Sequence, residues 1–291
     1  MKVGNKVLGL AVGQRSILIA EVAAKGQRQV VNRCAEFIFP EGLTMSTPEK
    51  LGLELRSFFD VGASIGRWSS RMSQDFPHAT YNLFEPLIDH CPDYRLKMQT
   101  TLSRHPEFKL HKVALGPECK KTTMFLYPDN LVGSTALPLD YMPQNARKVE
   151  IDMLTIDYVV EEFRLGVPQV IKMDTQGCEL NILQGGKKTL PQVDVLLLEC
   201  WLTRAYGPST PLLLEVAEWL RHVDFHIWDL GNAWRDDSGV LVAQDCLFLN
   251  ARSKVSRMKD EPSGPRQTAT EDLSTQEQLL RRVKNLLSRR T

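Results

Sequence analysis

The chain has 291 residues and a mass of 33.0 kDa, enough for one large domain or two small ones. Hydrophobic residues make up 43% and charged residues 24%; these near-average values exclude a collagen, a coiled coil or a largely disordered chain. The 36 Lys and Arg residues nearly balance the 35 Asp and Glu residues, and the net charge of +1 gives no overall electrostatic case for a nucleic-acid partner.

The six cysteines are scattered, and no Cys-x-x-Cys pair occurs. This spacing argues against a disulfide scaffold or a zinc ribbon and favours reduced thiols. An apolar stretch at 7–12 is ended by Gln14 and Arg15, too soon for a signal peptide or a membrane span. We therefore expect a soluble, cytoplasmic protein.

The first 45 residues predict a small β-rich segment. Strand-like runs at 7–11, 17–22 and 30–39 are separated by glycine-containing turn signals, which favours a β-meander. A helix starting at Pro48, with Ser46 or Thr47 as its cap, is expected to follow.

From about residue 58 to residue 250, strand-like runs alternate with helical segments. The expected strands lie at 58–61, 81–84, 109–115, 170–173 and 195–198, and a helix is expected at 180–189. Runs that are apolar on both faces indicate a parallel sheet covered on both sides, hence an α/β domain over 46–252. Runs at 225–230 and 245–250, joined by a polar turn, predict a closing antiparallel pair.

The C-terminal part separates into a linker and a helix. Residues 253–272 are poor in apolar residues and read as a linker. Residues 273–291 carry leucines on one helix face and five basic residues against Glu277. Such a basic amphipathic helix suits an anionic membrane surface or a partner protein.

The sharpest local signal is the run DVGASIG at 60–66, directly after an expected strand. Glycines at a strand–helix turn let a ligand approach the backbone, although the spacing is not that of Gly-x-Gly-x-x-Gly. Glu85 ends the next strand, where a carboxylate binds a ribose diol in dinucleotide folds; a solvated glutamate is the alternative. Together the two features favour an adenosine-containing ligand.

Four runs in order carry a family resemblance: DVGASIG at 60–66, FEP at 84–86, VALG at 113–116, and IKMDTQGCEL at 171–180 followed by LQGG at 183–186. They resemble successive motifs of the FkbM family of S-adenosylmethionine-dependent methyltransferases. The family pattern in the fourth run is close to Ile-Lys-Ile-Asp-x-Glu-Gly-x-Glu, and Gln176 stands in the place of the first Glu. The resemblance covers about residues 58–250.

The resemblance implies a class I methyltransferase (Rossmann-like) fold, with seven mostly parallel strands and an antiparallel last strand. It also implies a cofactor site for S-adenosylmethionine. In that site Gly62 and Gly66 would line the methionine and ribose part, with Ala63 in the same loop, and Asp60 would orient the loop or reach the methionine amine. Glu85 would accept hydrogen bonds from the ribose hydroxyls, and the segment containing Ala114 and Leu115 would flank the adenine.

Three further residues are candidates for the chemistry of methyl transfer to a hydroxyl. Asp174, at the tip of the fourth strand, is the candidate base or acceptor-orienting residue, with a helix cap as its alternative. Lys172 should share its face of the strand and hold Asp174 ionised, or form a structural ion pair. Glu199 ends another strand at the same rim and is a candidate for reading the acceptor. His222 and His226 are four apart, but the sequence does not favour a metal pair.

Residues 7–17 resemble the opening strand and phosphate-binding turn of pilus-assembly actin-like ATPases, in which the place of Ala11 normally holds an Asp. This substitution implies a segment without ATP chemistry; a plain β-meander is the alternative. For the whole chain we expect O-methylation of a carbohydrate or a secondary metabolite. The alternatives are a non-catalytic scaffold of a pilus or secretion system, and a nucleotide-sugar oxidoreductase.

Truncation after Ser253 should leave cofactor binding and catalysis unchanged, because the linker and the basic helix lie outside the expected methyltransferase domain. The truncated protein should no longer sediment with anionic vesicles, since the basic helix face is lost. Unfolding of the truncated protein would show instead that the helix packs on its own domain.

Overall fold

The computed structural model describes residues 6–12, 16–25, 28–38, 55–127, 133–137 and 146–253. The chain divides into two compact units, Met1–Met45 and Ser46–Thr291. The basic helix predicted at 273–291, nearly all of the linker at 253–272 and most of the helix predicted from Pro48 lie outside the described residues.

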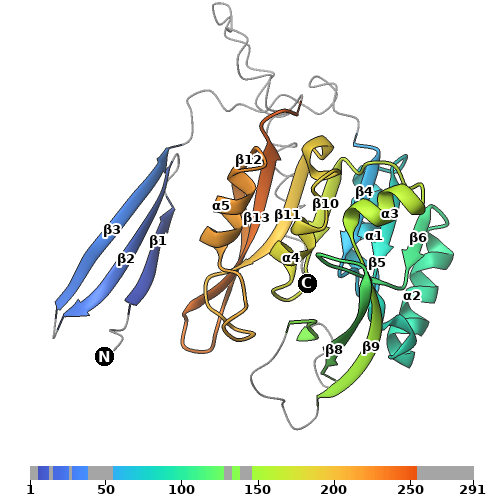
Figure 1. Ribbon diagram of the computed structural model, residues 1–291, viewed down its shortest axis with the longest axis horizontal. Coiled ribbons are helices and arrows are strands. Elements are labelled where there is room, and N and C mark those ends of the chain that lie inside the picture. Colours follow the sequence, from blue (N-terminus) through green and yellow to red (C-terminus); the bar gives the residue numbers. More distant parts are fainter. Residues whose placement is uncertain are drawn as a thin grey trace, which may run out of the picture. The chain divides into compact units, whose positions relative to one another are not determined.

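The first unit is an antiparallel meander of three strands, β1 (Lys6–Val12), β2 (Ser16–Lys25) and β3 (Arg28–Ile38), with β2 in the middle (Figure 1). The predicted meander is confirmed. β2 and β3 are longer than the apolar runs because flanking polar residues also pair; Lys25, for example, is opposite Arg28.

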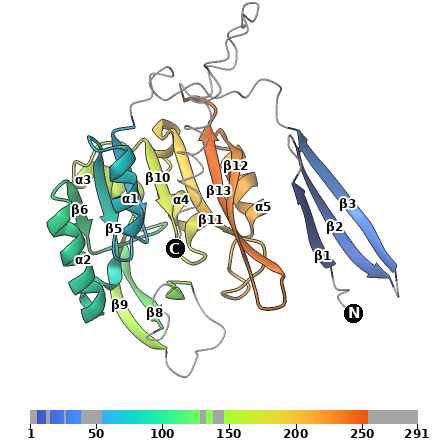
Figure 2. The same ribbon diagram turned by 180° about the vertical axis from the view of Figure 1, so that it is seen from behind.

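The second unit is built on a seven-stranded sheet with the order β12-β13-β11-β10-β4-β5-β6, which can be followed in Figures 1 and 2. Neighbours from β11 to β6 are parallel, and β13 is antiparallel to both β11 and β12. The predicted sheet with an antiparallel last strand is confirmed. Its strands are β4 (Ser57–Val61), β5 (Thr80–Phe84), β6 (Phe108–His111), β10 (Val170–Met173), β11 (Val195–Trp201), β12 (Phe225–Arg235) and β13 (Leu241–Asn250).

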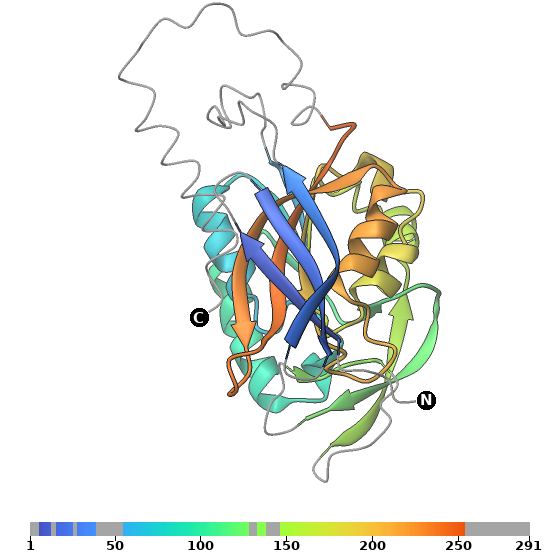
Figure 3. The ribbon, with the colours of Figure 1, turned by 90° about the vertical axis from the view of Figure 1, so that its left-hand side faces the viewer.

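Helices cover both faces of this sheet, as Figure 3 shows. Successive strand residues point to opposite faces, so Phe58 packs with α1 (Arg67–Asp75) and α2 (Pro92–Arg104), whereas Phe59 belongs to the core on the other side. That second core contains apolar residues of α3 (Ile156–Glu162), α4 (Glu179–Gln184) and α5 (Leu213–Arg221). Short 3-10 helices lie at η1 (Pro86–Asp89) and η3 (Leu190–Gln192). In the part of the chain that the structure describes, no helix has the length and hydropathy to cross a bilayer.

A smaller sheet is inserted between β6 and β10. It has the order β7-β9-β8 and consists of β7 (Ala114–Leu115), β8 (Lys120–Leu126) and β9 (Arg147–Leu154). The strand predicted at 109–115 is therefore two strands: β6 pairs with β5 in the large sheet, whereas β7 pairs with β9. The chain changes sheets at Lys112 and Val113.

The helix predicted at 180–189 is shorter than expected, since α4 ends at Gln184. The five residues after Gln184 are two glycines, two lysines and a threonine, so the apolar periodicity ends here, and Gly185 lies against the chain after β7. A Cβ atom at Gly185 would be 2.1 Å from the carbonyl oxygen of Gly116. The glycine pair at 185–186 is the sequence signal for this helix end, and the close approach of Gly116 leaves no room for a side chain at Gly185.

Candidate functional site

The loop that follows β4 turns sharply, with positive φ angles at Gly62 (71°), Ser64 (52°) and Gly66 (76°). Residues with a side chain rarely adopt this conformation, which glycine enters freely. At Gly62 space imposes the same requirement, because a Cβ atom would lie 2.1 Å from the carbonyl oxygen of Asp174. The loops after β4 and β10 therefore meet backbone to backbone, and a glycine is required there.

A buried ion pair supports this loop from below. Lys172 Nζ in β10 donates to Asp60 Oδ1 at 2.9 Å and to the carbonyl oxygen of Gly62 at 3.0 Å. Asp60 Oδ2 accepts a hydrogen bond from Ser69 Oγ of α1 at 2.8 Å. The side chains of Lys172 and Asp60 are 10% and 1% exposed. Two charges so far from water depend on each other, and they join β10, β4 and α1 beneath the glycine loop.

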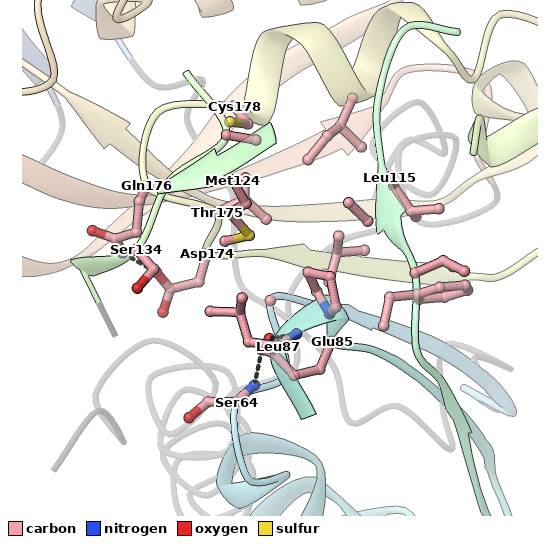
Figure 4. A pocket seen from close by; sticks show the side chains of 18 of the residues that line it. Ser64, Glu85, Leu87, Leu115, Met124, Ser134, Asp174, Thr175, Gln176 and Cys178 are labelled. Carbon is pink, nitrogen blue, oxygen red and sulfur yellow. Dashed lines mark hydrogen bonds between the residues drawn. The ribbon is translucent and has the colours of Figure 1, made fainter. Parts of the chain in front are cut away.

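Glu85 ends β5 and caps the short helix η1. Its Oε1 accepts from the amide of Leu87 at 3.0 Å and its Oε2 from the amide of Ser64 at 2.8 Å, the bonds drawn in Figure 4. Burial raises the pKa of Glu85 to about 7, although both amides and the charge of Lys172 act to lower it. The sequence suggests a strand-tip carboxylate outside the core; the structure instead buries Glu85, at 6% exposure, because the side chain turns inward to these amides.

A pocket with about 680 Å³ of empty space, part of it open to solvent, lies where these loops meet. Ser64 and Glu85 line one part of it, and Asp174 lines another (Figure 4). An apolar wall includes Ala114 and Leu115 of β7. The remaining lining residues are Val61, Gly62, Phe84, Pro86, Leu87, Tyr94, Val113, Met124, Ser134, Ala136, Thr175, Gln176, Cys178 and Ile182. The pocket thus combines an apolar slot with carboxylates at the carboxyl ends of parallel strands, the usual ligand site of such sheets.

Gln176 joins two carboxylates beside this pocket. Its Nε2 donates to Asp174 Oδ1 at 2.8 Å and to Glu199 Oε2 at 2.9 Å, and its Oε1 accepts from the hydroxyl of Tyr206. The backbone of Gln176 has a φ of 56°, which costs of order 1–3 kcal/mol for a residue with a side chain. Three side-chain hydrogen bonds hold the residue in this strained conformation and fix the direction of its amide.

The loop after β11 holds Tyr206 in place. Arg204 Nη1 donates to the carbonyl oxygens of Thr210 at 2.6 Å and Pro208 at 3.1 Å, and its Nη2 donates to Glu215 of α5 at 2.6 Å. The amide of Tyr206 donates to Thr210 Oγ1 at 3.0 Å. The hydrogen-bond network at the pocket therefore extends through this loop to α5.

Glu179 caps the turn that follows β10. Its Oε1 accepts from the amide of Thr175 at 2.8 Å and from Thr175 Oγ1 at 2.9 Å. Burial raises the pKa of Glu179 to about 7. The sequence left a helix cap open as an alternative role for Asp174; in the structure Glu179 makes these bonds, and the Asp174 side chain lines the pocket.

The structure sorts the predicted site residues into three groups. Gly62, Glu85, Ala114, Leu115 and Asp174 line the pocket, whereas Glu199 is buried and connected to it through Gln176. The third group does not line the pocket; its members are Asp60, Ala63, Gly66 and Lys172. A Cβ atom at Gly66 would be 2.9 Å from Thr101 Cγ2 of α2, so that glycine serves the packing of the loop. The hydrogen bonds of Lys172 described above are those of a structural ion pair, the alternative that the sequence left open.

Sequence reasoning missed Gln176 and Tyr206 as site residues. Gln176 is part of the motif at 171–180, and its departure from the family pattern was the available signal. The sequence contains no such signal for Tyr206, because only the fold of its loop brings its hydroxyl to Gln176.

The histidines and tryptophans contribute less to this region. His222 is the C-terminal cap residue of α5, and His226 lies on β12. Within the described ranges no group of three or more His, Cys, Asp or Glu side chains has the arrangement of a metal site. Trp201 is buried, whereas Trp234 is 56% exposed with its ring edge-on to Trp201.

Comparison with known proteins gives one matching family model and several similar solved structures. The model of the methyltransferase FkbM domain matches residues 60–227. No curated protein matches the sequence. Among solved structures, a methyltransferase FkbM from Methylobacillus flagellatus is 19% identical, with a TM-score of 0.44. The match covers 67% of this chain and 44% of that protein, so the chain spans less than half the length of that relative.

Two other solved structures are similar at lower identity. A precorrin-6y C5,15-methyltransferase from Geobacter metallireducens is 12% identical over 69% of this chain and 84% of its own, with a TM-score of 0.36. A 1,6-didemethyltoxoflavin-N1-methyltransferase from Burkholderia thailandensis is 11% identical over 70% and 74%, with a TM-score of 0.35. All three TM-scores lie below 0.5, and none of these proteins is a guide to what this chain binds.

Replacing Lys172 by Met should lower the free energy of unfolding by about 3–5 kcal/mol, because Asp60 then keeps a buried charge without its counter-ion. Urea denaturation measures this loss. The matched control is Lys112→Met, which breaks an ion pair with Asp89 whose side chains are 50% and 51% exposed; its effect should stay within about 1 kcal/mol. Equal losses in the two variants would contradict a supporting role for the buried pair.

Proposed function

The chain belongs to the FkbM family of methyltransferases, and on that premise we propose that it transfers a methyl group from S-adenosylmethionine to a hydroxyl of a carbohydrate or a secondary metabolite. The observation that carries the proposal is that Glu85 and Asp174 line the same pocket. One carboxylate suits the ribose of the cofactor and the other suits the proton of an acceptor hydroxyl.

The residues of the pocket fit the proposed cofactor by their chemistry. The carboxylate of Glu85 is held by two amides and suits hydroxyl donors such as a ribose diol. The apolar wall at Ala114 and Leu115 suits the flat face of an adenine. Gly62 brings the backbone of the glycine loop to the edge of the pocket without a side chain in between.

S-adenosylmethionine supplies a methyl group on a sulfonium, which is already a good leaving group. The task left to the chain is to place an acceptor oxygen in line and to take up its proton. Alignment in a bound complex is a large source of rate enhancement, and general-base help contributes about 10²–10⁴-fold. In the proposal Asp174 takes the proton, while the glycine loop and the network around Gln176 keep its carboxylate in place.

Gln176 and Glu199 act in this proposal as positioning residues. A neutral amide donates to both Asp174 and Glu199 without carrying a proton that either carboxylate can remove. A glutamate in this place would put three carboxylates together, and one of them would be expected to bind a proton. The acidic pair favours an acceptor rich in hydroxyl donors, which is the reason for preferring a carbohydrate or a hydroxylated metabolite.

Isothermal titration with S-adenosylmethionine, S-adenosylhomocysteine, NAD and ATP tests this function against its alternatives. Both adenosyl compounds should bind, and NAD and ATP should not. Binding of NAD alone would favour an oxidoreductase, and absence of all binding would favour a non-catalytic scaffold. Transfer of a labelled methyl group to a panel of hydroxylated acceptors then identifies the acceptor class.

The affinity for S-adenosylhomocysteine should rise about tenfold between about pH 6 and about pH 8. With a pKa of about 7, Glu85 is mostly protonated at the lower pH and mostly ionised at the higher one, and only the ionised form accepts from both ribose hydroxyls. Glu85→Gln should remove this pH dependence and weaken binding by about 1.5–3 kcal/mol at the higher pH. If Glu85→Gln keeps the pH dependence of the affinity, another titrating group causes it. Glu179 is then the first residue to test, because its pKa is also about 7.

Asp174→Asn should lower turnover at least about 10²-fold and leave the affinity for S-adenosylhomocysteine nearly unchanged. The variant keeps the shape of the side chain and an oxygen for the bond from Gln176, but it loses the basicity. Turnover is measured by methyl transfer to an acceptor from the panel and affinity by titration. A collapse of cofactor affinity would show that Asp174 binds the cofactor or supports the loop instead.

A further inference from the structure

Tyr94 brings an unpaired hydroxyl to the wall of this pocket. The residue lies in the first turn of α2, lines the pocket and is 8% exposed. Its Oη atom is buried and has no hydrogen-bond partner among the described residues. A buried hydroxyl left unpaired costs about 1–3 kcal/mol, and most buried polar atoms of side chains are paired. An unpaired donor in a pocket wall therefore indicates a ligand group that pairs with it.

Several residues that line the pocket act on this hydroxyl. Burial is the main reason why the pKa of Tyr94 is raised. The Ser64 hydroxyl lowers this pKa through its interaction with the phenol, without meeting the geometry of a hydrogen bond, and Glu85, Cys91 and Asp174 raise it further. A phenol with a raised pKa stays protonated in neutral solution and acts as a donor. Of the groups that act on it, Ser64, Glu85 and Asp174 are polar residues that line the pocket.

Two other tyrosines show what a satisfied phenol looks like in this protein. Tyr81 is fully buried, and its hydroxyl donates to the carbonyl oxygen of Phe76 at 3.0 Å. Tyr206 donates to Gln176 Oε1. Each of these two hydroxyls has a hydrogen-bond acceptor within the chain, whereas the hydroxyl of Tyr94 has none among the described residues.

We propose that the hydroxyl of Tyr94 donates a hydrogen bond to a ribose hydroxyl oxygen of the cofactor. This inference rests on the proposed function, in which Glu85 accepts the protons of the ribose hydroxyls. A hydroxyl that donates to a carboxylate still has lone pairs to offer, and a donor near that carboxylate completes its bonding. Glu85 and Tyr94 then recognise the ribose together, one as acceptor and the other as donor.

The carboxylate in the amino-acid part of the cofactor is the competing acceptor for this bond. The negative charges of Glu85 and Asp174 act on the phenol and disfavour an anion beside it. A ribose oxygen is neutral and carries its own protons, which those same carboxylates attract. The charges around Tyr94 therefore favour the ribose.

Titration of Tyr94→Phe with S-adenosylhomocysteine and with 5′-methylthioadenosine, which lacks the amino-acid part, tests the assignment. Both affinities should fall by the same factor, about 3- to 10-fold. The melting temperature of the ligand-free variant should equal or exceed that of the wild type, because the substitution removes an unpaired buried hydroxyl. Tyr81→Phe is the matched control: its melting temperature should fall and its affinity for both ligands should not change.

Three results would overturn the assignment. Unchanged affinities in Tyr94→Phe would show that the hydroxyl does not contact the ligand. A loss confined to S-adenosylhomocysteine would place the bond on the amino-acid part rather than the ribose. A melting temperature that falls as in Tyr81→Phe would show that the hydroxyl has a partner within the chain. Wild-type protein that binds neither ligand would instead overturn the proposed function itself.

Discussion

The buried ion pair between Asp60 and Lys172 is the interaction on which the rest of the site depends. It joins the two central parallel strands, and through the carbonyl of Gly62 and the hydroxyl of Ser69 it also fixes the glycine loop and the start of α1. Burying two charges is costly unless their geometry is good and their remaining bonds are satisfied, and here the glycine loop supplies part of that satisfaction. Folding of the loop and pairing of the charges therefore reinforce each other.

A second constraint is the contact between the loops after β4 and β10. Because a Cβ atom at Gly62 would lie 2.1 Å from the carbonyl oxygen of Asp174, the position of the proposed base is set by backbone packing as well as by its own side chain. Gln176 adds side-chain bonds to Asp174 and Glu199 and takes one from Tyr206. A carboxylate held from both sides is suited to a reaction in which alignment supplies much of the rate.

The two ends of the pocket are also coupled through charge. Glu85 is buried, and Lys172 is among the groups that lower its pKa while Asp60 raises it. The ion pair that supports the glycine loop thus acts on the carboxylate proposed to bind the ribose. Asp174 and Glu85 both raise the pKa of Tyr94, so a change at either carboxylate should also affect this phenol.

The sequence by itself determined the order of the sheet's strands along the chain, the antiparallel closing pair and the strand ends that bear Glu85 and Asp174, because apolar periodicity and motif spacing are local properties. Tertiary structure decided the rest. It made Lys172 the partner of Asp60 (these residues are 112 positions apart), buried Glu85 by turning it to the amides of Ser64 and Leu87, and brought Tyr206 to Gln176 from a loop 30 positions away. No local sequence pattern predicts these contacts, because they join segments that only the packing of the parallel sheet brings together.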